Sequence, residues 1–513
     1  MRPVLSPAEA GELDRASQAR GIQAETLMEN AGREVARAAL EVAGGAYGTR
    51  AVVVCGKGNN GGDGLVAARY LSRWGARVTV LMLEVPEDLR EPAATNFARL
   101  AETDVRVRPF SRSTLDRELA RADVAVDAIF GTGFRGVPED EWAEAIDGLN
   151  DGRAFHGVPV VAVDIPSGVN GSTGAVEGEA VWADVTVTFG AAKTGVVLLP
   201  GAERAGAVRV VDIGFPPDLL RSDLWLMEEE DVAALVPVRE LETHKRATGV
   251  VLVVGGSRLM TGAVCLVAAA AYRVGAGLVQ VAVPGSILPV VQSLVREATF
   301  VPLPETPEGT VAPEASEVLA ERLPAADALA LGPGMTTHEA TAAWIRATVA
   351  TSPVPVVLDA DGLNAFTDRA PELAARRADL VLTPHAGEFA RIAGVGAREI
   401  AADRLGHVRA LAAETKATVL LKGTRTLVAT PEGHVRVNPT GGPYLATGGT
   451  GDVLTGAIAG LLARGLAPVD AASVGAFVHG RAGALAAERT GEGTTAVDVL
   501  EHVAEALRGI RGA

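Results

Sequence analysis

Apolar runs alternate with amphipathic stretches along the first half of the chain. Ser6, Pro7 and Glu9 have the spacing of an N-cap, a first-turn proline and a capping box, which predicts a helix through residues 10–21. Between residues 26 and 40 an apolar residue recurs every fourth position, which predicts a second helix. Strands are predicted at 51–55, 77–83, 123–131, 159–165, 184–190 and 207–214. Apolar strands separated by helical patterns are typical of a mostly parallel sheet covered on both faces.

The pattern begins again after a Pro-Pro pair and an acidic run near residue 220. Further strands are predicted at 248–257, 277–284, 326–334, 354–362, 378–388, 417–423 and 426–433, with alanine-rich helices between them. We therefore predict two three-layer α/β domains, residues 1–220 with a Rossmann-like order and residues 221–513. The motifs of the two halves follow different orders, so duplication is not expected.

Composition narrows the class of protein. The chain has 513 residues, of which 48% are hydrophobic, and it carries 63 acidic against 47 basic side chains. The basic residues are scattered, so no nucleic-acid partner is expected. The N-terminus lacks the apolar core of a signal peptide and no uncharged apolar run is long enough to cross a bilayer, which predicts a soluble, cytoplasmic protein without a membrane partner. The two cysteines, Cys55 and Cys265, lie in different predicted domains and are expected to be reduced thiols.

A glycine turn at residues 56–65, GKGNNGGDGL, joins a predicted strand to a predicted helix. It satisfies the G-x-G-x-x-G pattern of dinucleotide-binding dehydrogenases, and Glu84 stands near the end of the next strand. However, Asp63 would repel a pyrophosphate at this helix start, which favours another ligand geometry. Simple helix capping by Asp63 is the alternative.

Two later strand ends carry polar side chains at the edge where parallel sheets bind ligands. Asp127 ends one strand ahead of a glycine-rich loop at 131–136, and Asp164 ends another ahead of Ser167. Together with Asn60, these oxygens could hold a hard cation. Asp164 is also a candidate acid/base, while Lys193 is either a positive charge near the ligand or an ordinary strand-end lysine.

In the second half, the turn at 447–451 leads into a helix predicted to begin at Asp452. Backbone N–H groups there can face phosphate charge, and Asp452 can accept the proton of a hydroxyl that attacks a phosphoryl group. Lys422 fits a phosphate-binding strand end. A zinc site is not expected, because His385 and Glu388 lack further ligands. Asp359 and Asp361 are either part of the same cleft or solvated turn carboxylates.

The segments LMENAG, GKGNNGGDG, DAIFGTG and DIPSG, in this order, resemble the NAD(P)H-hydrate epimerase domain. The resemblance implies that the hydrated nucleotide is lined by Asn59, Asn60, Gly61, Gly62, Asp63, Gly131, Thr132, Gly133, Phe134, Arg135, Gly136, Val137 and Asp164. It also implies that potassium is held by Asn60, Asp127 and Ser167.

The segments VVGGS, GPG, LDADGLN, TPHAGE, LLKG and GGTGDVL resemble the ribokinase-like NAD(P)H-hydrate dehydratase domain. The resemblance implies that Ala263, Gly334, His385 and Asp452 contact the hydrate, and that Lys422, Gly423, Thr424, Arg425, Thr426 and Gly451 hold the adenine nucleotide. It implies Mg²⁺ and a phosphoryl donor, ADP by preference or ATP. A homo-oligomer is expected on the same ground.

These resemblances imply one chain that epimerises R and S hydrates and then dehydrates the S form, with Asp164 and Asp452 as the catalytic residues. Three alternatives stay open at this point. They are a small-molecule kinase, a first half that only binds or regulates, and a dehydrogenase.

Overall fold

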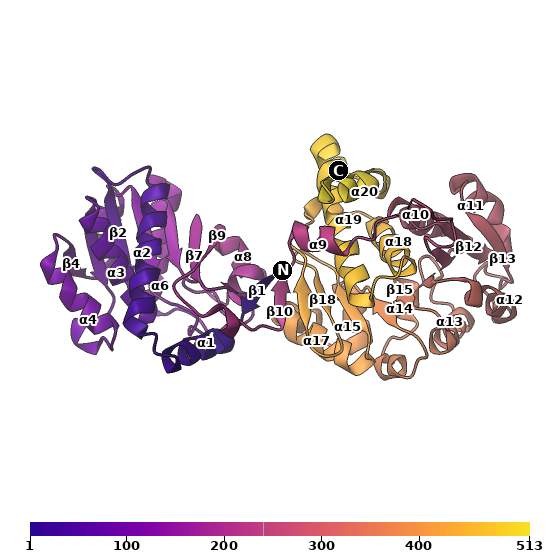
Figure 1. Ribbon diagram of the computed structural model, residues 1–513, viewed down its shortest axis with the longest axis horizontal. Helices are drawn as coiled ribbons and strands as arrows, with labels where there is room; N and C mark the ends of the chain where they lie inside the picture. Colours follow the sequence, from indigo (N-terminus) through magenta and orange to yellow (C-terminus); the bar gives the residue numbers. More distant parts are fainter. Residues whose placement is uncertain (240, 513) are drawn as a thin grey trace. The chain divides into compact units, whose positions relative to one another are not determined.

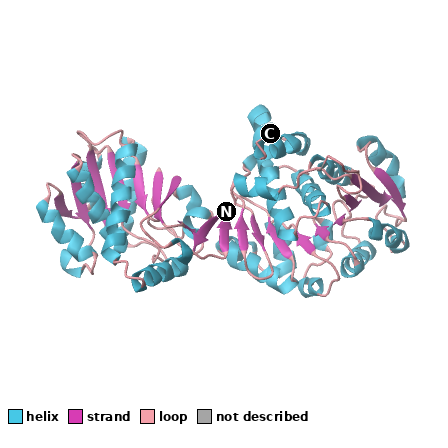
Figure 2. Ribbon diagram, viewed as in Figure 1, coloured by secondary structure: helices cyan, strands magenta, loops and turns pink. Residues whose placement is uncertain are grey.

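The computed structural model describes residues 1–239 and 241–512, which form two compact units. The first unit is Arg2–Leu224 and the second begins at Trp225. Short strand β10 (Leu224–Leu226) spans this division. Both units are α/β, as the sequence predicts (Figure 1, Figure 2).

The first unit is built on a seven-stranded sheet of order β4-β3-β2-β5-β6-β7-β9, in which every neighbouring pair is parallel. Its elements are β1 (Arg2–Leu5), α1 (Pro7–Ala19), α2 (Ala24–Val42), β2 (Arg50–Cys55), α3 (Asn59–Arg73), β3 (Arg77–Met82), α4 (Ala93–Ala98), β4 (Arg106–Pro109), α5 (Arg112–Leu119), β5 (Val124–Ala128), α6 (Asp140–His156), β6 (Val160–Val163), β7 (Val185–Phe189), β8 (Ala192–Lys193), α7 (Thr194–Val197), α8 (Gly201–Arg204) and β9 (Ala207–Val211).

Side-chain alternation along the strands gives this sheet a core on each face. Val53 and Cys55 of β2 pack with α2 and α3, whereas Val52 and Val54 pack with α5 and α6. The capping box at the start of α1 is confirmed, because Glu9 N donates to Ser6 Oγ and Ser6 N donates to Glu9 Oε2. The carboxyl ends of the central strands are therefore held rigidly at one edge.

Two strand pairings in the first unit were not predicted. Edge strand β4 is exposed at every residue, so it has no apolar signature. Strands β1 and β8 pair in parallel over only two positions, Val4 with Ala192 and Leu5 with Lys193. This short pairing places α1 beside the end of β7, which matters for the site described below.

The second unit has the sheet order β13-β12-β11-β14-β15-β16-β17-β18-β19, parallel except for the β17-β18 and β18-β19 pairs. Its elements are α9 (Glu229–Leu235), β11 (Val250–Val254), α10 (Gly262–Arg273), β12 (Leu278–Pro284), α11 (Leu288–Leu294), β13 (Thr299–Leu303), α12 (Ala315–Arg322), β14 (Ala328–Leu331), α13 (Glu339–Thr351), β15 (Val356–Leu358), α14 (Asp361–Asn364), β16 (Leu380–Leu382), α15 (Ala386–Ala393), α16 (Ala397–Ala402), α17 (Arg404–Thr415), β17 (Thr418–Leu421), β18 (Leu427–Ala429), β19 (Val435–Val437), α18 (Thr450–Ala463), α19 (Pro468–Thr490) and α20 (Ala496–Ile510).

One large apolar core covers a face of this sheet. Helices α10, α18, α19 and α20 pack there against residues such as Val251, Val253 and Ala330. Helix α18 is almost wholly buried, so the turn that precedes it has a fixed position above the strands. Among the described residues, no helix has both the length and the hydrophobicity needed to cross a membrane.

Candidate active sites

The first unit contains a cavity of about 1050 Å³ at the carboxyl edge of its sheet. Small-molecule pockets usually measure about 300–1,000 Å³, so this cavity suits a large ligand. Helix α1, the start of α3 and the loop after β5 supply most of its wall. Its lining includes the predicted residues Asn59, Asn60, Asp63, Gly131, Thr132, Gly133, Phe134, Arg135, Val137 and Asp164.

Three predicted ligand-binding glycines do not line this cavity. A Cβ on Gly61 would lie 1.9 Å from the Gly56 carbonyl oxygen, and one on Gly62 would lie 2.6 Å from Met28 Cε. Both glycines therefore serve the close packing of the turn against the protein itself. Gly136 has a left-handed φ of 85° and shapes the loop after β5 without being part of the wall.

Asp63 does not cap a helix, so that alternative is wrong. The N-cap of α3 is Gly58, and Asp63 lies one turn further into the helix with 8% of its surface exposed. Burial raises the pKa of Asp63 well above its usual value. The carboxylates of Asp164 and Asp14 raise it further, whereas Lys193 opposes them.

Asp164 forms a buried ion pair with Lys193. Lys193 Nζ lies 2.6 Å from Asp164 Oδ1, and 4% of the lysine side chain is exposed. Thr188 Oγ1 donates to the same carboxylate oxygen at 2.9 Å, and Phe189 N donates to it at 3.3 Å. Asp164 has a left-handed φ of 63°, a strained conformation that is common at functional sites. The sequence left two interpretations of Lys193 open, and the structure places this lysine against Asp164, the predicted acid/base.

The predicted cation ligands of the first unit lie together. Ser167 Oγ and N both donate to the fully buried Asp127 carboxylate, at 2.5 and 2.8 Å. Phe130 N donates to Ser167 Oγ at 2.9 Å, and Asn60 Nδ2 donates to Phe130 O at 2.9 Å. Burial raises the pKa of Asp127 to about 6. Carboxylate, hydroxyl, amide and carbonyl oxygens are all available here, so the donor set fits an alkali cation.

In the second unit, α18 begins at Thr450, two residues before the predicted start. Gly449 is its N-cap with a left-handed φ of 92°, and Asp452 is in the first turn. Thr450 Oγ1 donates to Leu445 O and Thr447 O, at 2.8 and 2.9 Å, which fixes the preceding turn. Burial, followed by the Asp359 carboxylate, raises the pKa of Asp452 to about 7.

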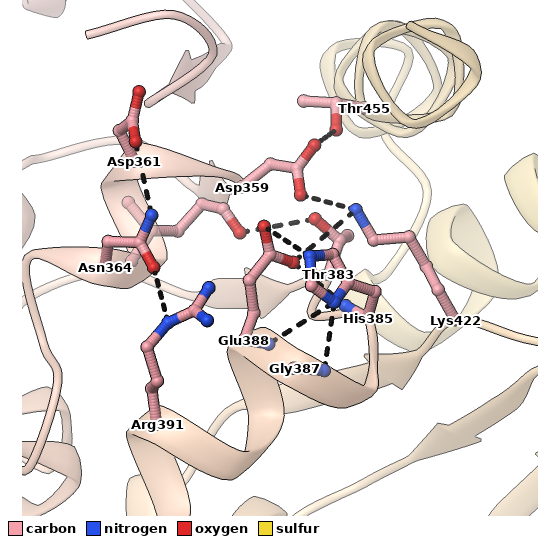
Figure 3. Close-up of polar contacts among 11 residues, drawn as sticks. Asp359, Asp361, Asn364, Thr383, His385, Gly387, Glu388, Arg391, Lys422 and Thr455 are labelled. Atoms are coloured by element: carbon pink, nitrogen blue, oxygen red, sulfur yellow. Dashed lines mark hydrogen bonds and ion pairs between the residues drawn. The ribbon is translucent and has the colours of Figure 1, made fainter. Parts of the chain in front are cut away.

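Asp452 lies within the electrostatic reach of Asp359, Lys422 and Glu388. Figure 3 shows the contacts among these three neighbours. Lys422 Nζ lies 2.7 Å from Asp359 Oδ1 and 4.0 Å from Glu388 Oε2. Thr455 Oγ1, from α18, donates to Asp359 Oδ2 at 2.6 Å. Asp359 is only 1% exposed, so the alternative of a solvated turn carboxylate is wrong for this residue. A carboxyl group with a pKa of about 7 beside a lysine is suited to proton transfer next to phosphate charge.

His385 forms hydrogen bonds at the start of α15, and 56% of its side chain is exposed. Its Nδ1 accepts from Gly387 N at 3.0 Å and caps α15, while His385 N donates to Glu388 Oε2 at 2.9 Å. No cluster of three or more potential metal ligands among His, Cys, Asp and Glu occurs in the described part of the chain.

The other predicted residues of the second unit lie at neighbouring strand ends. Ala263 is in the first turn of α10, and a Cβ on Gly334 would lie 2.9 Å from Met260 O just before that helix. Residues 422–426 form the turn between β17 and β18, which Arg404 holds through Thr424 O at 2.7 Å. A Cβ on Gly451 would lie 3.3 Å from Lys422 Nζ, so this turn meets the start of α18.

Sequence reasoning missed or undervalued three groups. Asp14 lines the first cavity from α1, and burial raises its pKa. Lys193 and Asp359 were considered without an assigned role, yet each is the centre of a buried ion pair. For Asp359 the available signal was its position directly after a buried strand, and Lys193 lies four residues after the buried strand β7. Asp14 offered none.

The folds and the two sites define an enzyme with two α/β units, each of which joins a strand to a helix through a glycine-rich turn beside titratable side chains. Two family models match. YjeF-related protein N-terminus matches residues 24–195, and NAD(P)H-hydrate dehydratase matches residues 251–505. The chain belongs to the family of bifunctional NAD(P)H-hydrate repair enzymes, which have epimerase and dehydratase activity.

Relatives of that name cover the whole chain. One from Moorella thermoacetica is 42% identical over 99% of this chain and 97% of its own length, and one from Thermofilum pendens is 41% identical over 97% and 95%. Among solved structures, a ribokinase-like superfamily protein from Enterococcus faecalis is 21% identical with a TM-score of 0.50 and covers 57% of this chain and 98% of its own. That likeness shows the fold of the second unit.

Proposed function

We propose that the first unit interconverts the R and S hydrates of NADH and NADPH, and that the second unit converts the S hydrate into the intact dinucleotide at the cost of a nucleotide phosphate. The observation that supports this division best is the pair of separate carboxyl–lysine sites. Asp164 with Lys193 lies in a cavity of dinucleotide size, and Asp452 lies beside Lys422 at a helix start.

In the first unit, Asp164 is the base that removes the proton of the added hydroxyl. Asn60, Asp127 and Ser167 would hold potassium together with Phe130 O. When bound, the cation supplies positive charge to a buried carboxylate and fixes the loop that lines the cavity. The lining residues Asn59, Asp63 and 131–137 are assigned to the substrate, with Gly61, Gly62 and Gly136 in supporting positions.

In the second unit, Asp452 takes the proton of the substrate hydroxyl as its oxygen attacks the terminal phosphoryl group of the donor. The C–O bond of the resulting phosphate ester then breaks, and inorganic phosphate leaves as the lone pair of the ring nitrogen forms a double bond to the carbon. Loss of a proton from the neighbouring carbon restores NADH or NADPH. Lys422 and the N–H groups near Gly451 neutralise phosphate charge. Ala263, Gly334 and His385 are assigned to the hydrate.

We favour ADP over ATP as the phosphoryl donor. The nucleotide would bind along residues 422–426, with Mg²⁺ on its phosphates. Two features of the structure support this position for the nucleotide. The turn at 422–426 adjoins the start of α18 through Lys422 and Gly451, and Arg404 fixes its backbone. A Bacillus subtilis NAD(P)H-hydrate dehydratase that was co-crystallised with ATP and Mg²⁺ is described as ADP/ATP-dependent. A homo-oligomer remains a prediction.

The test is incubation of the full chain with mixed hydrate epimers and either ADP or ATP, with each species followed by chromatography. Both epimers should disappear and reduced dinucleotide should form without any oxidant or reductant. A stable phosphorylated product would instead indicate a small-molecule kinase. If Asp164→Ala leaves the conversion of R to S unchanged, the first unit only binds or regulates.

A further inference from the structure

The cavity of the first unit is lined by five carboxyl groups and two lysines, and three of these carboxyl groups lie around Lys193. Asp14 comes from α1, Asp63 from α3, Asp164 from the end of β6 and Lys193 from β8. They differ sharply in their contacts, although they share one wall. The question is which of the carboxyl groups carries a proton when the substrate is bound.

Asp164 is the carboxyl group that contacts Lys193 directly. Its contacts within the described residues all go to Oδ1, which receives Lys193 Nζ, Thr188 Oγ1 and Phe189 N. Oδ2 is left for a ligand. Lys193 Nζ also donates to Thr188 Oγ1 at 3.2 Å and to Phe189 O at 2.7 Å, so all three of its N–H groups are used around Asp164.

Asp63 lies in the opposite environment. Only 8% of Asp63 is exposed, and burial and neighbouring charges, without any hydrogen bond from the described residues, set the pKa of its carboxyl group. Asp164 and Asp14 are like charges that face it, and Lys193 is committed to Asp164. A buried carboxyl without a cation of its own favours the neutral acid.

We propose that Asp63 is a second catalytic residue of the first unit, a neutral acid that acts together with the ionised base Asp164, while Lys193 is the positioning residue that fixes this division. The inference rests on the proposed epimerase function. It extends that function by naming both the group that removes a proton from the substrate and the group that donates one to it.

The step balances without a further reactant. Asp164 Oδ2 removes the proton of the substrate hydroxyl, a C=O bond forms, and the bond from that carbon to the ring nitrogen breaks. Asp63 gives its proton to the nitrogen. After rotation the nitrogen attacks the other face of the carbonyl, returns the proton to Asp63, and the oxygen regains a proton from Asp164. One carbon is inverted, and both carboxyl groups end as they began.

The test uses the full-length chain with Asp63→Asn and, as a matched control, Asp88→Asn, an exposed carboxyl of the same unit. Asp63→Asn should lower kcat for epimerisation by about 10² or more and leave KM near its original value. It should also abolish the loss of activity at high pH, because that loss reports deprotonation of the acid. Dehydration of pure S hydrate, measured on the same chain, should not change.

Asp63→Glu keeps a proton donor and should recover part of kcat together with the loss at high pH. If the wild-type chain interconverts the epimers but Asp63→Asn keeps its kcat, or if the glutamate variant melts normally yet is no better than the asparagine variant, the assignment of Asp63 is overturned while the epimerase function stands. Entry of ¹⁸O from labelled water at every inversion would overturn the ring-opening step. If the wild-type chain interconverts no hydrate, the proposed function itself fails.

Discussion

The two units use a glycine-rich turn for different purposes. In the first unit, a Cβ on Gly61 or Gly56 would lie within 2.3 Å of a backbone carbonyl oxygen of the protein. In the second unit, a Cβ on Gly448 would meet nothing within 4 Å. Gly56 and Gly61 of the first turn are therefore compressed by the protein's own packing, whereas Gly58 has open space and lines the cavity. The second turn leaves open space in front of backbone N–H groups.

The two units nevertheless share an electrostatic arrangement. In each, one lysine is bound to a carboxylate at about hydrogen-bond distance, Lys193 to Asp164 and Lys422 to Asp359. A further carboxyl group with a raised pKa lies nearby, namely the buried Asp63 in the first unit and the half-buried Asp452 in the second. In each unit the lysine lowers the pKa of the further carboxyl group, but burial and the neighbouring carboxylates raise it by more. The two glycine-rich motifs are thus similar in sequence but differ in packing. The segments that supply the charged side chains differ in sequence, yet they form a similar charge arrangement.

The largest effect is expected from Asp452→Asn, which tests whether the two sites work independently. The amide cannot accept the proton of the substrate hydroxyl, so dehydration should fall by roughly 10²–10⁴. Epimerisation, followed by chromatography of the R and S hydrates, should be retained. An equal loss of both activities would show that the variant is misfolded or that the two units do not act separately.

Much of each site could be predicted because strand ends are visible in the sequence. Asp127, Asp164 and Lys422 directly follow apolar runs, and parallel strands bring their carboxyl ends to one edge. The capping box at Ser6 and the central strands of both sheets were also predicted, from the spacing of polar residues and from apolar runs. The helix start at Asp452 was placed two residues late, because the glycine N-cap has no side chain to reveal it.

The remaining features depend on tertiary pairing. Asp14 reaches the first cavity only because β1 pairs with β8 over two residues, which is too short for an alternating pattern. The ion pair between Lys193 and Asp164 similarly joins residues from different strands. Edge strands β4 and β13 carry exposed polar or mixed residues, so their hydrophobic signal is weak.

The contrast between the turns predicts unequal effects of alanine. Gly61→Ala places a Cβ 1.9 Å from Gly56 O, and the backbone must shift. Such overpacking usually costs about 1–3 kcal/mol and occasionally more, so the melting temperature of the first unit should fall measurably by calorimetry. Gly448→Ala should leave melting unchanged within error, while the apparent KM for the nucleotide rises. Comparable destabilisation by both changes would break the contrast.

The charge arrangement around Asp452 predicts a pH dependence of dehydration. The base must be ionised, and burial followed by Asp359 raises the pKa of Asp452 to about 7. The rate under saturating substrate should therefore fall about tenfold for each pH unit below about 7 and level off above it. Glu388→Gln removes one like charge near Asp452 and should move this fall to lower pH. A rate that stays flat from about pH 5 to pH 8 would contradict Asp452 as the base.

The smallest effect concerns the cation ligands, which are a feature of the first unit alone. Asp127 is fully buried against hydroxyl and amide groups, so a bound potassium ion should stabilise the first unit and not the second. At potassium concentrations near tenfold the dissociation constant, the gain is about 1.4 kcal/mol, which corresponds to roughly 2–6 °C in melting temperature. The measurement is calorimetry in potassium chloride and in tetramethylammonium chloride at equal ionic strength. Asp127→Asn keeps the shape of the side chain but removes its charge, so the difference between the two salts should disappear. A shift of the same size in the asparagine variant would place the ion elsewhere and remove this distinction between the two units.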